Sequence, residues 1–358
     1  MKREHLNVLK SASNNATPKP ALSSLERLGW QPFFAQQTSI DELAVSPPVR
    51  VVEVQRSGLR VRGDGLETVL PPNAEITVGD WLLLDENRPN APILLQRKGL
   101  IKRRAAGHDR KIQLIAANID TVFVVTSCNP DFNIARLERY IALALEAQVT
   151  PVIVLTKADM CDDAAPYRQQ AESISETVDV VVLDARGEEP KSKLATWCKP
   201  GQTVAFLGSS GVGKSTLTNS LAENDSIETQ AIREDDARGR HTTTSRQLYL
   251  LDNGCAVLDT PGMRELQLTD VEAGLADLFS DIEDLATQCR FNDCQHAQEP
   301  DCAVLTAIEN GELDEKRFER WRKLAAEEQF NSSTLAERRS KDRAFGKMVR
   351  KAVQHKKR

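Results

Sequence analysis

Residues 208–215 constrain the fold of this chain more than any other stretch. They read Gly-Ser-Ser-Gly-Val-Gly-Lys-Ser and fit the pattern GxxxxGK[ST]. An apolar run, Thr203–Leu207, precedes them, and Thr216–Asn219 can begin a helix. In a strand–loop–helix unit of this kind, backbone N–H groups and the helix start bind phosphate oxygens. The context favours a phosphate-binding loop over a chance Gly-rich turn.

This loop supplies the first candidate site, for a nucleoside triphosphate. Lys214 should reach the β- and γ-phosphates and take part in catalysis, and the Ser215 hydroxyl should ligate Mg²⁺. The residues expected to bind the phosphates are Gly208, Ser209, Ser210, Gly211, Val212, Gly213, Lys214, Ser215 and Thr216.

The charge of the chain is unevenly distributed. Its 358 residues suit two or three domains and carry a net charge of −5. Residues 97–111 nevertheless hold seven Lys or Arg against one Asp, and residues 336–358 hold ten against two acidic residues. Local basic patches indicate contacts with a polyanion, with solubilising surface charge as the alternative.

The sequence carries no sign of a membrane or an oxidising compartment. It has no run of about 18 apolar residues, so we expect no membrane span. Residues 1–20 are polar and lack the apolar core of a signal peptide. We therefore expect a cytoplasmic protein, in which thiols stay reduced. The seven cysteines are then core residues or metal ligands.

The N-terminal part changes character at about residue 46. Residues 1–45 form an arm with a short helix expected around Leu22, Leu25 and Leu28. Residues 46–105 should form a five-stranded OB-type or SH3-like β-barrel, a fold that often binds nucleic acid but can also dock proteins. The expected strands are Val49–Gln55, Leu59–Arg62, Glu67–Leu70, Trp81–Asp85 and Ile93–Gln96, separated by turn signals.

Residues 106–268 alternate strand and helix patterns, which predicts a mostly parallel, doubly wound α/β sheet. Helical patterns cover Ile134–Ala147 and Asp162–Thr177. Residues 269–330 should form a helical domain, and 331–358 a basic tail. The expected strands of the sheet are Thr121–Thr126, Val152–Thr156, Val178–Leu183, Thr203–Leu207, Gln247–Leu251 and Cys255–Leu258.

Two further motifs indicate what the nucleotide is. Thr156-Lys157-Ala158-Asp159 ends a strand and resembles an NKxD base-recognition motif with Thr in the first position. Asp159 could accept hydrogen bonds from guanine N1–H and the 2-amino group, a pair of donors that adenine lacks. Asp184-Ala185 follows the next strand, where an SA-type base loop would fall. GTP is therefore favoured over ATP.

A third motif would sense the terminal phosphate. Asp259-Thr260-Pro261-Gly262 follows an apolar run, the context of a DxxG switch. Asp259 should hold the Mg²⁺ shell through water, and the Gly262 N–H should contact the γ-phosphate. Ordinary GTPases place the base motifs after the phosphate loop, whereas here they precede it. This order indicates a circular permutation, which nearby domain termini permit.

The catalytic group is less obvious. Many GTPases position the attacking water with a Gln just after DxxG, but Met263 stands there. His241, in Arg238-Gly239-Arg240-His241-Thr242-Thr243-Thr244, is our candidate, with a solvated loop residue as the alternative. Thr242 or Thr243 should ligate Mg²⁺, and we favour Thr243.

Cys289, Cys294, His296 and Cys302 fall within fourteen residues. Three thiolates and one imidazole suit tetrahedral Zn²⁺ and leave no position for a substrate, which favours one structural zinc per chain over coincident thiols.

Together these features resemble the circularly permuted GTPases called RsgA or YjeQ. The matching stretches are residues 156–159, 208–216, 238–244 and 259–262, the Cys/His cluster, and Ala117-Asn118-Ile119-Asp120. The resemblance implies an OB barrel, a permuted GTPase domain and a zinc-bearing helical domain. It also implies GTP hydrolysis stimulated by the small ribosomal subunit during its late maturation, with the 30S subunit and 16S rRNA as partners.

Two other functions remain open. Because position 263 is not Gln, the chain could instead be an RNA-binding regulator in which GTP hydrolysis is incidental. The third possibility, a generic P-loop ATPase or kinase, is disfavoured by Asp159. We expect a monomer. Because the chain runs from the DxxG switch directly into the helical domain, loss of GTP should shift that domain and weaken ribosome binding.

Overall fold

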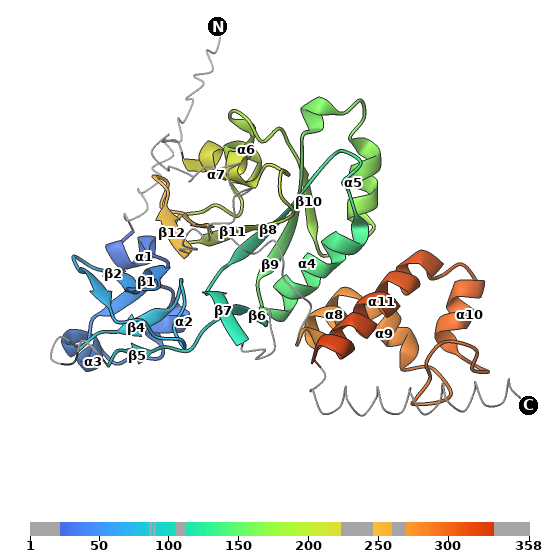
Figure 1. Cartoon of the computed structure of the whole chain (residues 1–358), viewed down its shortest axis with the longest axis horizontal. Coiled ribbons are helices and arrows are strands. Elements are labelled where there is room, and N and C mark those ends of the chain that lie inside the picture. Colours follow the sequence, from blue (N-terminus) through green and yellow to red (C-terminus); the bar gives the residue numbers. More distant parts are fainter. Residues whose placement is uncertain are drawn as a thin grey trace, which may run out of the picture.

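The computed structural model describes residues 22–85, 88, 91–104, 112–222, 246–259 and 270–332. Figure 1 shows antiparallel strands at the N-terminal end, an α/β layer in the middle and a group of helices at the C-terminal end. None of the helices in these ranges is long and apolar enough to cross a membrane.

The described part of the N-terminal arm consists of three short helices, α1 (Ser24–Arg27), α2 (Pro32–Ala35) and α3 (Ile40–Val45). Capping boxes begin α1 at Ser23 and α3 at Ser39. The helices pack on the neighbouring strands, because Leu28 and Phe34 share a buried cluster with Trp81. This apolar contact anchors residues 22–45 to the strands.

The next region holds the five expected strands. They are β1 (Pro48–Gln55), β2 (Gly58–Gly63), β3 (Glu67–Leu70), β4 (Trp81–Leu83) and β5 (Ile93–Leu94). They pair antiparallel in the order β3-β2-β1-β4-β5 around a core of alternating strand residues, including Val49, Val51, Leu59 and Val61.

A two-stranded ribbon that we did not predict follows them. Strand β6 (Leu100–Arg104) pairs antiparallel with β7 (Ile112–Ala117). The ribbon connects the N-terminal strands to the central sheet and carries part of the basic stretch noted in the sequence.

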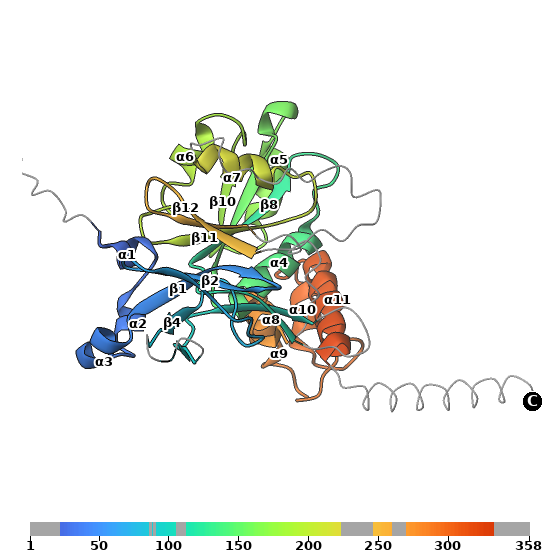
Figure 2. The same cartoon turned by 60° about the vertical axis from the view of Figure 1, so that its left-hand side comes forward.

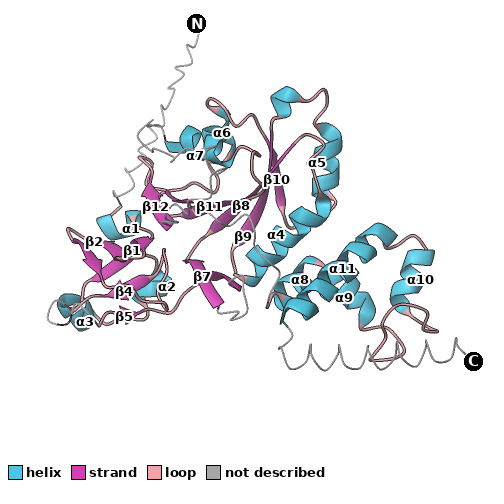
Figure 3. Ribbon diagram, in the orientation of Figure 1, coloured by secondary structure: helices cyan, strands magenta, loops and turns pink. Residues whose placement is uncertain are grey.

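The central sheet confirms the predicted α/β class. Its order is β10-β9-β8-β11-β13-β12, with parallel pairs throughout except for the antiparallel pair β12–β13. Figure 3 shows these strands running through the centre of the molecule. The strands are β8 (Thr121–Ser127), β9 (Thr150–Thr156), β10 (Asp179–Val182), β11 (Thr203–Leu207), β12 (Arg246–Leu250) and β13 (Ala256–Asp259).

Helices cover both faces of this sheet, as a doubly wound fold requires. Val122 and Val124 of β8 belong to one core together with α4 (Ile134–Glu146) and the segment around α5 (Ala165–Glu172). Phe123 and Val125 belong to a second core together with Leu194, at the C-terminal end of α6 (Glu189–Lys193), and residues of α7 (Lys214–Ala222). The alternation of side chains along a strand explains why β8 is buried at every position.

The central sheet continues into the N-terminal strands. Strand β12 pairs antiparallel with β1, with Glu53 opposite Gln247 and Val54 opposite Arg246. The Arg246 guanidinium also donates to the carbonyl oxygen of Leu114 on β7. Strand β12 is therefore bonded both to strand β1 of the N-terminal region and to strand β7 of the ribbon.

The C-terminal region is helical and packs on α4. It contains α8 (Glu272–Leu278), α9 (Ser280–Ala286), α10 (Ala303–Glu309) and α11 (Glu315–Ser332). Figure 2 shows these helices beside α4. Gly274 permits the close approach, because a Cβ atom there would lie 2.1 Å from the Ala142 carbonyl oxygen. Arg320 Nε also donates to both oxygens of the buried Glu138 carboxylate, at 2.9 and 3.0 Å.

Candidate nucleotide site and metal centre

The phosphate loop lies between β11 and α7, as predicted. Gly208, Gly211 and Gly213 have φ angles of 149°, 77° and 96°, which favour glycine. A Cβ atom on Gly208 would also lie 2.2 Å from the Val125 carbonyl oxygen. Lys214 Nζ donates to the carbonyl oxygens of Gly208, at 2.9 Å, and Ser209. The ammonium group is thus held within the curl of the loop.

The polar side chains of the loop face solvent where phosphates would lie. Ser210, Ser215 and Thr216 are exposed, and Val212 is buried beneath the loop. Ser215 and Thr216 fall in the first turn of α7, where free N–H groups and the helix dipole favour an anion.

The base-recognition motif contacts this loop directly. Thr156, fully buried at the end of β9, donates through Oγ1 to the Val212 carbonyl oxygen at 2.6 Å and lies 3.2 Å from the Thr126 carbonyl oxygen. Lys157 then adopts a left-handed conformation with φ of 57°. This turn starts the short 3-10 segment Ala158–Met160, on which Asp159 is exposed to solvent.

The Asp184-Ala185 loop reaches the same edge of the sheet. Ala185 is buried, and its carbonyl oxygen accepts a 2.7 Å bond from Ser220 of α7. A Cβ atom on Gly213 would lie 3.6 Å from Ala185 Cβ and 3.7 Å from Thr156 Oγ1. Three segments separated in sequence therefore converge at the carboxyl ends of β9, β10 and β11, the edge at which parallel α/β sheets bind ligands.

The switch residues are only partly described. Asp259 ends β13, which runs parallel to β11 with Leu258 opposite Ala205, so its backbone reaches the same edge as the phosphate loop. His241, Thr243 and Gly262, together with Met263, lie outside the described residues. The roles predicted for them stay predictions.

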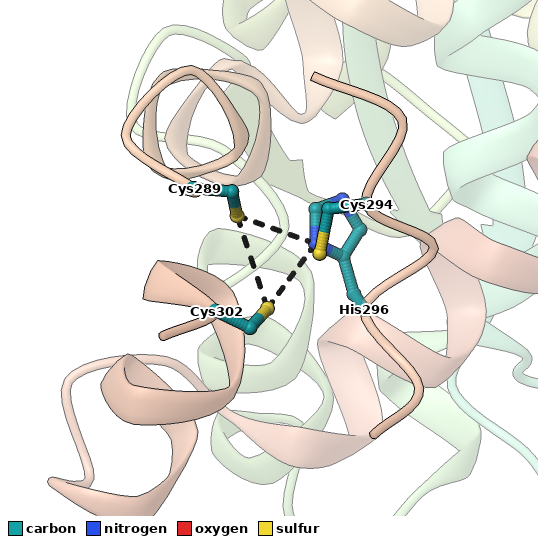
Figure 4. Close-up of side chains that lie close together, drawn as sticks. All are labelled: Cys289, Cys294, His296 and Cys302. Carbon is teal, nitrogen blue, oxygen red and sulfur yellow. Dashed lines mark hydrogen bonds between the residues drawn. The ribbon is translucent and has the colours of Figure 1, made fainter. Parts of the chain in front are cut away.

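The four predicted metal ligands come together between α9 and α10 (Figure 4). The donor atoms of Cys289, Cys294, His296 and Cys302 all lie within 4.8 Å of one another. Cys289 Sγ is 3.8 Å from Cys302 Sγ and 3.6 Å from His296 Nδ1, and His296 Nδ1 is 3.4 Å from Cys302 Sγ. Tetrahedral zinc with bonds of about 2.3 Å places its sulfur ligands about 3.8 Å apart, so the group fits a metal ion of this kind.

The surroundings of the cluster hold it in place. His296 has a φ of 52° and packs against the rings of Phe318 and Trp321 on α11, at centroid distances of 6.3 and 6.0 Å. Burial lowers the pKa of His296, which favours the neutral imidazole that metals require. By contrast, burial raises the pKa of Cys128, outside the cluster, to about 11, which disfavours its thiolate form.

Comparison with known proteins identifies the family. The RsgA GTPase family matches residues 94–269. The chain is also 48% identical over 335 residues to a protein of Vibrio parahaemolyticus named small ribosomal subunit biogenesis GTPase RsgA 2, covering 93% of each chain. The chain belongs to the RsgA GTPase family.

Solved structures support the RsgA-family fold. The crystal structure of YjeQ from Thermotoga maritima has a TM-score of 0.59 and 27% identity, covering 77% of this chain and 96% of that one. YloQ, described as a circularly permuted GTPase, has a TM-score of 0.55 and 24% identity, covering 81% of this chain and 97% of that one. The second likeness supports the permuted order of strands.

One residue of this RsgA-family site escaped prediction from sequence. Arg136, in the first turn of α4, donates through Nη1 to Ser209 Oγ of the phosphate loop at 2.7 Å. The segment was predicted only as an amphipathic helix, and an exposed arginine on such a helix carries no motif. The contact depends on the parallel neighbours β8 and β11, whose carboxyl ends bring the start of α4 beside the loop.

Proposed function

We propose that this chain hydrolyses GTP to GDP as a switch in late maturation of the small ribosomal subunit. The Thr156–Val212 hydrogen bond carries the nucleotide assignment, since it joins a base-recognition segment to a phosphate loop in one site. The name of the Vibrio relative supports the ribosomal role. In this proposal the 30S subunit and its 16S rRNA bind the protein and stimulate hydrolysis.

In the proposed site the nucleotide lies across the three converging segments. Thr156 to Asp159, with Asp184 and Ala185, bind the guanine end, and residues 208–216 bind the phosphates. Ser215 and Thr243 ligate Mg²⁺, while Asp259 and Gly262 respond to the γ-phosphate. Lys214 neutralises charge that develops on the transferred phosphoryl group.

His241 is proposed to orient the attacking water, because Met263 cannot bond water strongly. The test is phosphate release by His241→Ala in the presence of 30S subunits, with His5→Ala as a control outside the motifs and the basic stretches. We expect His241→Ala to lose most of the stimulated rate while it still binds GTP. Full stimulated turnover by that variant would remove His241 from the mechanism.

The metal proposed for the Cys/His cluster is one structural Zn²⁺ per chain. Four protein donors complete a tetrahedral shell and leave no position for a substrate. The loop between α9 and α10 contributes few apolar side chains to the core, so the metal would stabilise it.

The domain organisation is proposed as follows. Residues 1–45 form an arm, 46–105 an OB-type barrel, 106–268 the permuted GTPase domain, 269–330 the zinc-binding domain and 331–358 a basic tail. The barrel and the tail are proposed to contact rRNA, helped by Lys102 and Arg103 on the ribbon β6–β7. We further propose that the protein is a cytoplasmic monomer, and we expect its RNA contacts to weaken steeply with salt.

The switch itself can be tested by co-sedimentation with 30S subunits. We expect retention with a non-hydrolysable GTP analogue and release with GDP, because the helical domain follows the switch segment directly. Equal retention in both nucleotide states would contradict a switch, although hydrolysis could still occur.

A further inference from the structure

The contact between α4 and the phosphate loop places a second cation there. Arg136 Nη1 donates to Ser209 Oγ at 2.7 Å, and the carbonyl oxygen of the same serine accepts from Lys214 Nζ. A guanidinium and an ammonium group therefore converge on one residue. An anion bound beside Ser209 would therefore meet both positive charges.

The backbone of Arg136 is fixed by a helix cap, while its side chain is exposed at the phosphate loop. Asn133 caps α4 by accepting the Arg136 N–H at 2.9 Å. The Arg136 side chain is exposed, and within the described ranges it forms no ion pair. Arg139, one turn further along, is by contrast paired with Glu327 of α11. Arg139 serves the contact between helices, whereas the charge of Arg136 remains available at the loop.

The position of Ser209 indicates which phosphate this charge would meet. Gly213, at the far end of the loop, faces Thr156 and Ala185, which belong to the base end of the site. Ser209 lies at the opposite end, beside the Lys214 ammonium group. In loops of this kind the lysine reaches the β- and γ-phosphates rather than the α-phosphate.

We propose that Arg136 binds the terminal phosphate of bound GTP and makes the site prefer the triphosphate over the diphosphate. The inference rests on the proposed function and adds a specificity-determining residue to that site. Arginine is suited to this role, because its planar guanidinium can donate two parallel hydrogen bonds to phosphate oxygens. Ser209 holds the guanidinium beside the loop until the γ-phosphate arrives.

Equilibrium binding of GDP and of a non-hydrolysable GTP analogue, each with Mg²⁺, tests the proposal. We expect Arg136→Ala to weaken analogue binding roughly ten- to a hundredfold, as the loss of a charge-assisted hydrogen bond does, and GDP binding by less than about threefold. Arg136→Lys should recover part of the loss. The control is Arg168→Ala, which removes an exposed helical arginine that pairs with Glu172.

A purely structural role would give a different result. If Arg136 only shaped the loop, Arg136→Ala would weaken both nucleotides equally, and Ser209→Ala would do the same. Equal losses for both nucleotides, or no loss for either, would overturn the proposal. Failure of the proposed function would appear separately, as a wild-type chain that binds guanine nucleotides no better than adenine nucleotides.

Discussion

The hydroxyl group of Thr156 donates a 2.6 Å hydrogen bond to the carbonyl oxygen of Val212 and so joins the base-recognition segment to the phosphate loop. Both residues are buried, at 0% and 4% exposure. A buried carbonyl that loses its donor carries the full desolvation cost. The threonine that departs from the NKxD pattern therefore has a structural role at the centre of the site.

Replacing this threonine by its apolar isostere tests that role. We expect Thr156→Val to weaken GTP and GDP binding alike, by roughly five- to tenfold, since about 1 kcal/mol is lost with one buried hydrogen bond. Thr203→Val is the matched control, because Thr203 is equally buried and its hydroxyl has no partner in the described part of the chain. Equal binding by both variants would argue against the contact.

A second prediction concerns the identity of the base. Asp159→Asn should weaken GTP binding at least about tenfold, because the amide cannot accept bonds from both guanine donors. The same variant should bind xanthosine triphosphate better than the wild-type chain does, since xanthine has a carbonyl oxygen where guanine has an amino group. Competition binding with GTP and xanthosine triphosphate measures this change in base preference. Unchanged preference would remove Asp159 from base recognition.

A further prediction concerns the metal centre: replacing one candidate ligand should cause loss of the metal and destabilise the structure around it. Cys302 is a buried candidate ligand, and its Sγ also accepts the Leu305 N–H at the start of α10. We expect Cys302→Ser to retain well under one zinc per chain and to unfold at a lower temperature. Cys161→Ser, outside the cluster, should keep its metal. Elemental analysis and thermal unfolding of both variants provide the comparison.

The loop that carries the ligands has its own pH dependence. The Glu299 carboxylate accepts hydrogen bonds from the backbone N–H groups of Ala297, Gln295 and Gln298, and these bonds lower its pKa to about 2. A carboxylate with a lowered pKa contributes its full stability above the ordinary value of 4.5 and loses it as the pH falls toward 2.

Glu299→Gln should accordingly speed metal loss to a chelator at pH 7, where the wild-type carboxylate is charged. The difference between the two proteins should shrink below about pH 4 as the wild-type group approaches protonation. A difference that stays constant over this range would mean that the charge of Glu299 is not the cause.

The close contact between α4 and α8 predicts a sharp effect on stability. Gly274→Ala would place a Cβ atom 2.1 Å from the Ala142 carbonyl oxygen and 2.7 Å from the Glu146 nitrogen. The helices must then separate, at a cost of about 1–3 kcal/mol in the free energy of unfolding. Ala273→Ser, at an exposed position on the same helix, should change it by less than about 0.5 kcal/mol. Denaturant unfolding measures both.

The strands could be predicted from sequence where they form a continuous apolar run. Residues 122–125 are apolar on both faces because each face meets its own layer of helices. The cysteine and histidine spacing likewise indicated a cluster that the structure brings together. In both cases the residues that form the feature are close together in the sequence, so the sequence pattern alone indicates it.

Contacts between distant segments could not be predicted in the same way. Arg50 lies in a strand, yet it is buried because Gly79 and Asn118 supply carbonyl oxygens, and burial lowers its pKa to about 10. The ribbon β6–β7 was missed because its first strand combines two apolar residues with three basic ones. The bond from Arg136 to Ser209 similarly depends on strand order.

The most direct test of the central claim is phosphate release from GTP and from ATP, each with and without 30S subunits. The account predicts slow release from GTP alone, a rise of at least tenfold with 30S subunits as in other assisted GTPases, and little release from ATP in either case. Equal turnover of ATP and GTP, or a GTP rate that 30S subunits leave unchanged, would contradict it.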